Sequence, residues 1–468
     1  MNERVPKIAL IAAAVVCPLV LLLLAYSQPR YFANVTNMGG LILIEGLAVA
    51  VWMYRRFFFA LVIVAFLFAG VRVAVGGYWT TGRWAILAVG AAVGSLVMLK
   101  ERNHRFGLFH VTAVFAVLTS IVSASVSQFP GVAILKASSF GLLFLYAGTG
   151  ARLAVTGRES RFFTGLLAAC EGFVAVMAVY YLIFGIGFMG NPNSLGAVMG
   201  VAAAPMLFWG ALLPEPLAVN RRRLILYLLS MYLTFHSHSR AGMAAALISC
   251  GLLCAALRKY TMIGAGVAII TICIAAGAIF NPDATERAFS SVTKTVLYKD
   301  STNGNVFASR EDPWQRALDT ISNHFWFGTG LGTADVINDG PVEMFVSTED
   351  ITSENGSSYL AILAGVGILG VLPFFLLMFL LLGKIARTVL WMLTTGNACH
   401  PAVPIAMIML AGLIHAAFED WLFAAGYHLC VLFWCLAFVF MDVAPSGHAI
   451  EWRFGAILRP LGVVAPNR

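Results

Sequence analysis

Apolar runs long enough to cross a membrane as helices recur along the whole chain. A transmembrane helix needs about 20 mostly apolar residues, and many of the runs approach or exceed that length. The pattern predicts an all-α fold, a polytopic transmembrane helical bundle of about 12–14 spans. The predicted spans are Ile8–Tyr26, Met38–Met53, Phe57–Gly76, Trp84–Met98, Phe106–Ala124, Val132–Gly150, Phe162–Ile186, Leu195–Leu213, Leu224–Phe235, Ala241–Leu257, Ile263–Phe280, Ser357–Leu382, Ala402–Phe418 and Trp421–Met441.

Composition excludes a soluble globular protein, because 60% of the 468 residues are hydrophobic and only 11% are charged. The eight cysteines form no CxxC pair and no ligand-spaced Cys/His cluster. The sequence therefore predicts no metal site, no cofactor and no disulfide framework. The net charge of +8 does not indicate nucleic-acid binding, because the basic residues lie mostly in short inter-helix turns.

The basic residues also predict the orientation of the bundle. One set of turns is rich in Lys and Arg, and the alternate turns carry few. The positive-inside rule places the basic turns and both termini in the cytoplasm. Because Ile8–Tyr26 is a long apolar run with no A-x-A site after it, we interpret it as a retained anchor. The basic turns carry Arg55-Arg56, Lys100, Arg102, Arg105, Arg152, Arg158, Arg161, Arg221-Arg222-Arg223, Arg258-Lys259, Lys384 and Arg387.

Asn281–Asn355 is the one long polar segment, inserted between spans of what we predict to be a single integral membrane domain over residues 1–468. It contains twelve acidic and five basic residues, a net charge of −7. This balance predicts a loop on the outer side, the side that the alternation of spans also gives.

One helix is predicted inside this loop, with Asp312 as N-cap and Pro313 as the first helical residue. An apolar stripe of Trp314, Leu318, Ile321 and Phe325 follows, and three glycines after it end the helix. Arg310 and Arg316 flank the predicted N-terminus. A helix N-terminus with arginines beside it favours anions, although the two arginines also fit an ordinary solvated pair bonded to nearby aspartates.

Arg240 is the strongest single candidate in the chain. It ends the run His236-Ser237-His238-Ser239-Arg240 between two apolar helices, on the outer side. A guanidinium at the mouth of a helical bundle is costly unless it faces a cavity or an anion. The alternative is an arginine that reaches to lipid phosphate. His238 is a candidate substrate-binding residue in the same run.

Glu354 precedes Asn355 at the start of a later span. Partial desolvation at the membrane surface would raise the pKa of Glu354 toward that of a general base. The alternative is an acid that merely complements the helix dipole. Asn355 is a candidate substrate-binding residue beside it.

Several other polar residues lie near the outer ends of spans. Asn191 and Asn193 belong to a Gly-Asn-Pro-Asn turn, which by itself indicates only a turn and a helix cap. Lys136 lies within a span near its outer end and is a candidate for adding charge to an anion site. Glu45 and Glu171 are candidate structural partners, and His415, Glu419 and Asp420 are candidates to line the cavity.

Four stretches, taken in order, resemble the O-antigen ligase/polymerase superfamily of bacterial inner-membrane glycosyltransferases. The stretches are GNPNSLGAVMGVAAAPML, SHSRAGMAAAL, ASREDPWQRALDTISNHFWFGTGLG and SENGSSYLAILAGVGILGVLPF. Order and topology agree over about residues 190–375. The resemblance implies a metal-independent enzyme of the inner membrane that acts at the periplasmic face. Its donor would be an undecaprenyl-diphosphate-linked glycan whose pyrophosphate is held by Arg240 and Arg310.

One departure from the family affects the expected activity. Ligases that transfer O-antigen to lipid A-core have a catalytic histidine where this chain has Glu354. We therefore expect a polymerase of repeat units, with Glu354, Arg240 and Arg310 as catalytic residues. Arg316, His238, Asn191, Asn193, Asn355 and Lys136 would bind substrate. Expected partners are a glycan or lipid acceptor, the bilayer and a chain-length regulator.

Three other functions remain open from the sequence. A cell-wall glycosyltransferase of the shape-and-division class shares the architecture but would have different loop signatures. A ligase shares the family motifs. A polysaccharide flippase is a different class, which related halves with paired, interrupted helices would favour. No internal repeat is visible, and one large asymmetric outer loop argues against the flippase.

Overall fold

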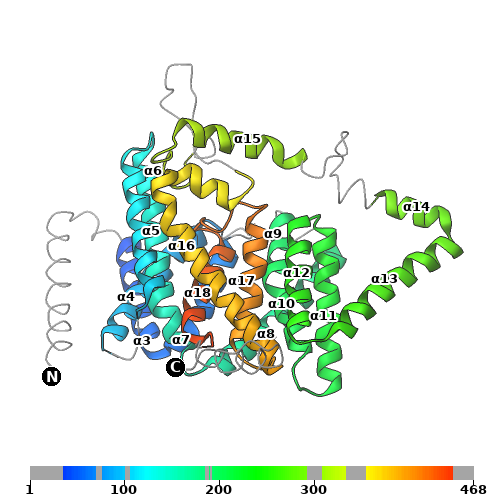
Figure 1. The fold of residues 1–468 in the computed structure, drawn as a ribbon. Helices are drawn as coiled ribbons and strands as arrows, with labels where there is room; N and C mark the ends of the chain where they lie inside the picture. The colour runs from blue at the N-terminus through cyan, green and yellow to red at the C-terminus, as the bar shows by residue number, and fades with distance from the viewer. Residues whose placement is uncertain are drawn as a thin grey trace, which may run out of the picture.

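The computed structural model describes residues 35–69, 76–100, 106–184, 189, 192–291, 308–333 and 355–445. Within these ranges the regular structure is helical and contains no strand, which confirms the all-α prediction (Figure 1). Six of the described helices are long and apolar enough to cross a membrane, and shorter apolar helices accompany them. The chain is therefore a multi-pass membrane protein.

The helices are α3 Val35–Ala69, α4 Gly76–Lys100, α5 Leu108–Ser125, α6 Pro130–Tyr146, α7 Arg152–Val155, α8 Glu159–Phe184, α9 Pro192–Val198, α10 Ala204–Ala211, α11 Leu217–His236, α12 Arg240–Ala256, α13 Tyr260–Phe280, α14 Pro282–Ser291, α15 Ala308–Asn323, α16 Ser358–Thr395, α17 Ala402–Ala416 and α18 His428–Val443. Two π-helical turns, η1 Ala147–Ala151 and η2 Met199–Ala203, join α6 to α7 and α9 to α10.

Two predicted element boundaries are wrong. Met38–Met53 and Phe57–Gly76 were expected as separate spans, but α3 continues through Arg55-Arg56 as one helix of 35 residues. Arginine is a good helix former, and no Gly or Pro lies between Leu47 and Ala69. Likewise, α11 begins at Leu217, so that Arg221-Arg222-Arg223 belong to a helix and not to a turn. The predicted first span, Ile8–Tyr26, lies outside the described residues.

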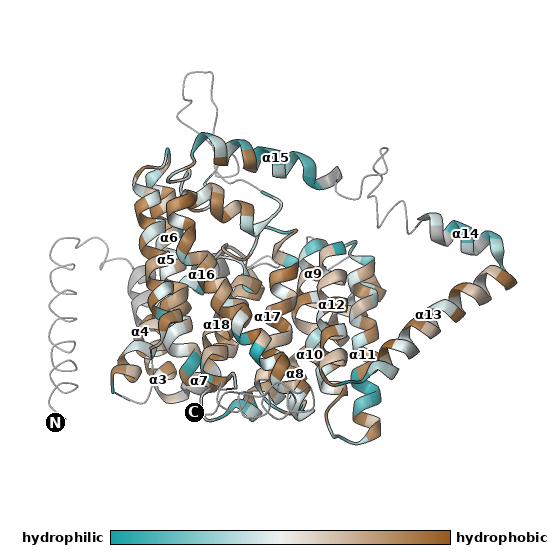
Figure 2. Cartoon of the chain, in the orientation of Figure 1, coloured by the Kyte–Doolittle hydropathy of each residue, from teal (hydrophilic) through white to brown (hydrophobic). Residues whose placement is uncertain are grey.

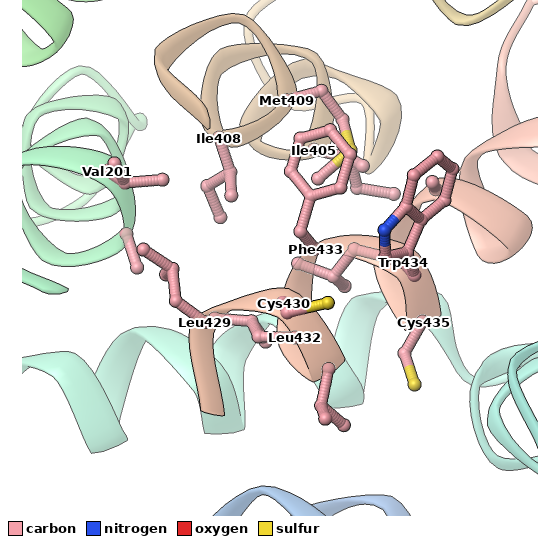
Figure 3. Packing of buried hydrophobic residues seen from close by; sticks show 14 of the residues in the cluster. Val201, Ile405, Ile408, Met409, Leu429, Cys430, Leu432, Phe433, Trp434 and Cys435 are labelled. Carbon is pink, nitrogen blue, oxygen red and sulfur yellow. The ribbon is translucent and has the colours of Figure 1, made fainter. Parts of the chain in front are cut away.

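The core lies between α17 and α18 and the helices around them (Figure 1). Trp434 is fully buried and packs edge-on against Phe144, with ring centroids 4.9 Å apart. Figure 3 shows Trp434 and Phe433 of α18 with Ile405 and Met409 of α17 in the same cluster. Apolar residues cover most of the bundle, and hydrophilic residues gather on α14 and α15 (Figure 2).

Two groups of charged residues within the bundle are paired. Arg152 is 1% exposed and donates two hydrogen bonds to Asp442, at 2.6 and 2.8 Å. Glu171 accepts from both Arg222 and Arg223, at 2.6 and 3.0 Å. Charges within membrane helices are retained when they are paired in this way. The interpretation of Glu171 as a structural partner is confirmed.

Helix α16 is broken at Gly367, whose φ of 66° and ψ of −179° are open to glycine and strained for other residues. The segment after α15 packs against the break and supplies hydrogen-bond partners. The Thr329 and Gly330 N–H groups donate to the carbonyls of Ala364 and Gly365, at 3.0 and 2.8 Å. Non-helical backbone at membrane depth is tolerated when protein surrounds it and satisfies its polar groups. This pairing fixes α15 and its following segment to the start of α16.

Candidate functional site

The starts of α9 and α12 are held together by glycines. A Cβ on Gly196 would lie 2.2 Å from the Ser239 Cβ, and one on Gly200 would lie 2.3 Å from the Gly242 carbonyl oxygen. Only glycine permits so close an approach of the two backbones. Ser239 is the N-cap of α12, and its hydroxyl accepts from the Gly242 N–H at 3.3 Å. Arg240, the first residue of α12, therefore lies beside the beginning of α9.

Helix α15 places Arg310 over the start of α16. A Cβ on Gly356 would lie 3.4 Å from both Arg310 Cδ and Trp314 Cδ1. The Trp314 indole also donates to the Gly356 carbonyl at 3.4 Å. The prediction of Asp312 as N-cap is wrong, because α15 begins at Ala308 and Pro313 lies inside it. The early start puts Arg310 within the first turn of α15.

The predicted apolar stripe of α15 coincides only in part with its buried face. Trp314 and Ile321 are partly buried, whereas Leu318 is 50% exposed and Phe325, beyond the end of α15, is 46% exposed. Trp314 packs beside Gly356 at the start of α16. The 4-3-4 spacing therefore identified the helix correctly but only half of the residues on the side that it buries.

Three charged side chains meet at this end of the bundle. Arg310 of α15 forms an ion pair with Glu419 from the segment between α17 and α18. Both side chains are largely shielded, at 18% and 22% exposure. Arg240 lies close enough for the charges of Arg310 and Glu419 both to act on it. The charges of two guanidinium groups and one carboxylate therefore act on one another at this end of the bundle.

The Ser358 hydroxyl anchors the segment that carries Glu419. It donates to the Glu419 carbonyl at 2.7 Å and accepts from the N–H groups of Trp421 and Leu422, both at 3.0 Å. Ser358 is fully buried at the first turn of α16. These three hydrogen bonds fix the backbone on both sides of Asp420, so the two acidic side chains have defined directions.

Tyr427 connects the same segment to α9. Its hydroxyl is hydrogen-bonded to Ser194, and the charge of Glu419 acts on it. Burial is the main cause that raises the pKa of Tyr427 to about 12. Tyr427 therefore stays neutral near physiological pH and offers a hydroxyl rather than a charge.

Lys136 and Asn355 interact with Asp420, the residue that follows Glu419. The Asn355 N–H donates to Asp420 Oδ2 at 3.4 Å. The Lys136 ammonium donates to the Gly332 carbonyl, and the charge of Asp420 acts on Lys136. Lys136 therefore interacts electrostatically with Asp420, whereas Glu419 interacts with Arg310 and Arg240.

Of the remaining predicted site residues, Asn193, His238 and Arg316 belong to the described part of the chain. Asn193 is half-buried near the start of α9. His238 is exposed in the turn before α12, with a φ of 53° that non-glycine residues rarely adopt. Arg316 is exposed on α15, and six residues of helix turn it about 120° away from Arg310. Asn191 and Glu354 lie outside the described residues.

The segment between α17 and α18 holds site residues that the sequence analysis did not identify. Glu419 and Asp420 were predicted only to line a cavity, and Ser358 and Tyr427 were not singled out. The signal was present, because two adjacent acids separate two apolar helices there. Acidic residues at membrane depth need specific partners, and the structure supplies Arg310, Lys136 and Asn355 as those partners.

Residues 225–375 match the family model described as O-antigen ligase. The match supports membership of the O-antigen ligase/polymerase superfamily. It covers less than half of the 468-residue chain, but it includes Arg240, Arg310 and the broken part of α16. No curated protein matches the chain. Members of this superfamily are glycosyltransferase-like enzymes, and the chain has the multi-pass helical architecture expected of one.

Proposed function

We propose that this protein is a polymerase of the O-antigen ligase/polymerase superfamily. It would join undecaprenyl-diphosphate-linked oligosaccharide repeat units into a surface polysaccharide, an O-antigen or an exopolysaccharide. The site would lie at the periplasmic face of the bacterial inner membrane, with both termini in the cytoplasm. A chain-length regulator is the protein partner that such a polymerase would need.

The observation that carries this proposal is that Arg310 pairs with Glu419 and that the charges of both act on Arg240. The arginines come from α12 and α15, which are separated by the apolar helix α13. Arginine binds phosphate through its planar, forked donors, and such charge-assisted bonds are short and strong. Two arginines at the end of an apolar bundle suit a diphosphate whose lipid tail lies in the bilayer.

The proposed reaction is transfer of a glycosyl group. An acceptor sugar hydroxyl attacks the anomeric carbon of the donor, and the bond from that carbon to the diphosphate oxygen breaks. Arg240 and Arg310 would stabilise the charge that grows on the leaving diphosphate. Glu354 would accept the hydroxyl proton. Its neighbour Asn355 is buried beside Asp420, and Gly356 packs on Arg310. The contacts of these two residues, which follow Glu354 in the sequence, support a role for Glu354 in the reaction.

A ligase is the second candidate function, and the description of the matching family favours it. A ligase would transfer the glycan to lipid A-core or another lipid acceptor through the same arginines. The glutamate at position 354, in place of the histidine of ligases, is the reason that we favour the polymerase.

Analysis of glycolipids in a deletion strain tests the proposal. A polymerase deletion should leave single repeat units on the lipid carrier at the periplasmic side, and mature polysaccharide should carry at most one repeat. A ligase deletion should instead leave long polymer on the carrier. A flippase deletion should hold single units at the cytoplasmic side. Either of the last two patterns would overturn the polymerase.

A further inference from the structure

A cavity of about 770 Å³ lies on the Asp420 side of the Glu419-Asp420 pair. Its walls come from α4, α6, the start of α16, and the segments after α15 and α17. Pockets of about 300–1,000 Å³, mostly apolar with a few polar groups, are typical small-molecule sites. The cavity has this character, with Lys136, Asp420 and Asn355 as polar groups and Trp84, Phe423 and Ile362 among the apolar ones.

The cavity reaches the outer surface of α6. Leu135 and Ser138 line it and are exposed, and Leu135 is 68% exposed. Because α6 belongs to a helix long and apolar enough to cross a membrane, an opening at these residues faces lipid. A ligand with an apolar chain can therefore enter from the side while its polar end reaches Asp420.

The polar end of the cavity suits a neutral head group. Lys136 donates to the Gly332 carbonyl and feels the charge of Asp420, so a negative charge accompanies its ammonium at this end of the cavity. Asp420 and Asn355 offer the acceptors and donors that bind hydroxyl groups. Aromatic side chains such as Trp84 and Phe423 give flat apolar surfaces on which the C–H face of a sugar ring packs.

We propose that this cavity binds the acceptor, a lipid-linked sugar whose hydroxyl-bearing ring lies between Asp420, Asn355 and Phe423. The inference rests on the proposed glycosyl transfer. Glu419 and Asp420 are adjacent, with Cα atoms about 3.8 Å apart, and they serve the anion site and the cavity respectively. The donor diphosphate would therefore bind beside Glu419 and the acceptor sugar beside Asp420, so that the two substrates lie next to each other.

The test uses a photoreactive alkyl glucoside with a diazirine in its alkyl chain. Purified protein in phospholipid nanodiscs free of glycoside detergent is irradiated with this probe, and labelled peptides are mapped by mass spectrometry. We expect labelling in residues 131–142 and 423–426. Octyl glucoside should block the labelling, and octyl phosphate should not.

Cavity-filling variants sharpen the result. Ser138→Trp should reduce labelling about tenfold, equivalent to about 1.4 kcal/mol. Ile134→Trp on the same helix is the control and should leave labelling unchanged, because Ile134 is 44% exposed and is not among the residues that line the cavity. If Ser138→Trp fails to fold, Ala424→Trp fills the cavity from the other wall, where Ala424 is exposed.

Two results would overturn this inference. One is labelling spread evenly over lipid-facing helices and insensitive to Ser138→Trp. The other is blocking by octyl phosphate but not by octyl glucoside, which would identify an anion site. Photolabelling requires neither the donor substrate nor glycosyl transfer. A failed glycolipid test with intact labelling would therefore reject the polymerase and not the cavity, and lost labelling with a normal glycolipid pattern would do the reverse.

Discussion

Arg310 and Glu419 form an ion pair between residues 109 positions apart in the sequence. The pair joins α15 to the segment between α17 and α18, and Arg240 lies within reach of both charges. In the proposed reaction, the donor diphosphate would compete with Glu419 for Arg310. The first prediction follows from this competition.

Glu419→Gln should strengthen the binding of inorganic pyrophosphate by about 1 kcal/mol, or roughly fivefold. Glutamine keeps an oxygen that accepts a hydrogen bond from Arg310 but removes the competing charge. Isothermal titration in nanodiscs measures the effect. Asp319→Asn is the control, because Asp319 is exposed on α15 and bonded to Gln315. Unchanged or weaker binding by Glu419→Gln would show that Glu419 does not compete for the anion.

Arg240→Ala should lower the rate of polymer formation by about 10²-fold or more, as expected for a group that stabilises developing charge. Arg240→Lys should restore only part of the rate, because lysine lacks the forked donors that suit phosphate. Polymer length and yield are measured on gels at equal protein level. Normal polymer from Arg240→Ala would remove Arg240 from the anion site.

Glu354→Gln separates the general base from the helix-dipole alternative. Loss of a general base should cost roughly 10²–10⁴-fold in rate, whereas loss of a dipole contact costs only about 0.3–1 kcal/mol of stability. Glu354→His should keep partial activity, since imidazole accepts the same proton. Initial rates of purified protein with a lipid-linked repeat unit are measured across pH. A wild-type rate for Glu354→Gln would leave proton removal to another group.

The orientation of the bundle is testable with one engineered cysteine and one native cysteine. Asp319→Cys on α15 should react with a membrane-impermeant thiol reagent in intact cells with a permeabilised outer membrane. Cys399 is exposed between α16 and α17, on the side predicted to be cytoplasmic, and should react only after the inner membrane is opened. The opposite pattern would move the candidate site to the cytoplasm.

Gly367→Ala should destabilise the protein by about 2 kcal/mol or more, as expected for backbone strain combined with overpacking. The added Cβ would lie 2.5 Å from the backbone of Trp326 and Phe327. Gly383→Ala in the same helix is the control, because no atom lies within 4 Å of its Cβ position. Thermal unfolding in detergent measures both. A melting temperature of Gly367→Ala equal to that of the control would show that the break at Gly367 is not required.

The class of the protein and its local chemistry can be predicted from the sequence alone. Apolar run length is a local property, and the bilayer thickness converts it directly into helical spans. The same locality made Arg240 recognisable as a charge at a helix start. Local signals gave wrong boundaries at α3 and α15, because spacing and capping patterns do not decide where a helix begins or how far it continues.

Which charges lie close together depends on the fold as a whole. Arg240, Arg310 and Glu419 come from three segments that no local pattern relates. Their meeting depends on the close approach of Gly196 to Ser239, on the pairing of the 329–330 backbone with broken α16, and on the three hydrogen bonds of Ser358. Each of these contacts joins segments that are far apart in the sequence, and the first two depend on how closely two backbones approach, about which the sequence carries little information.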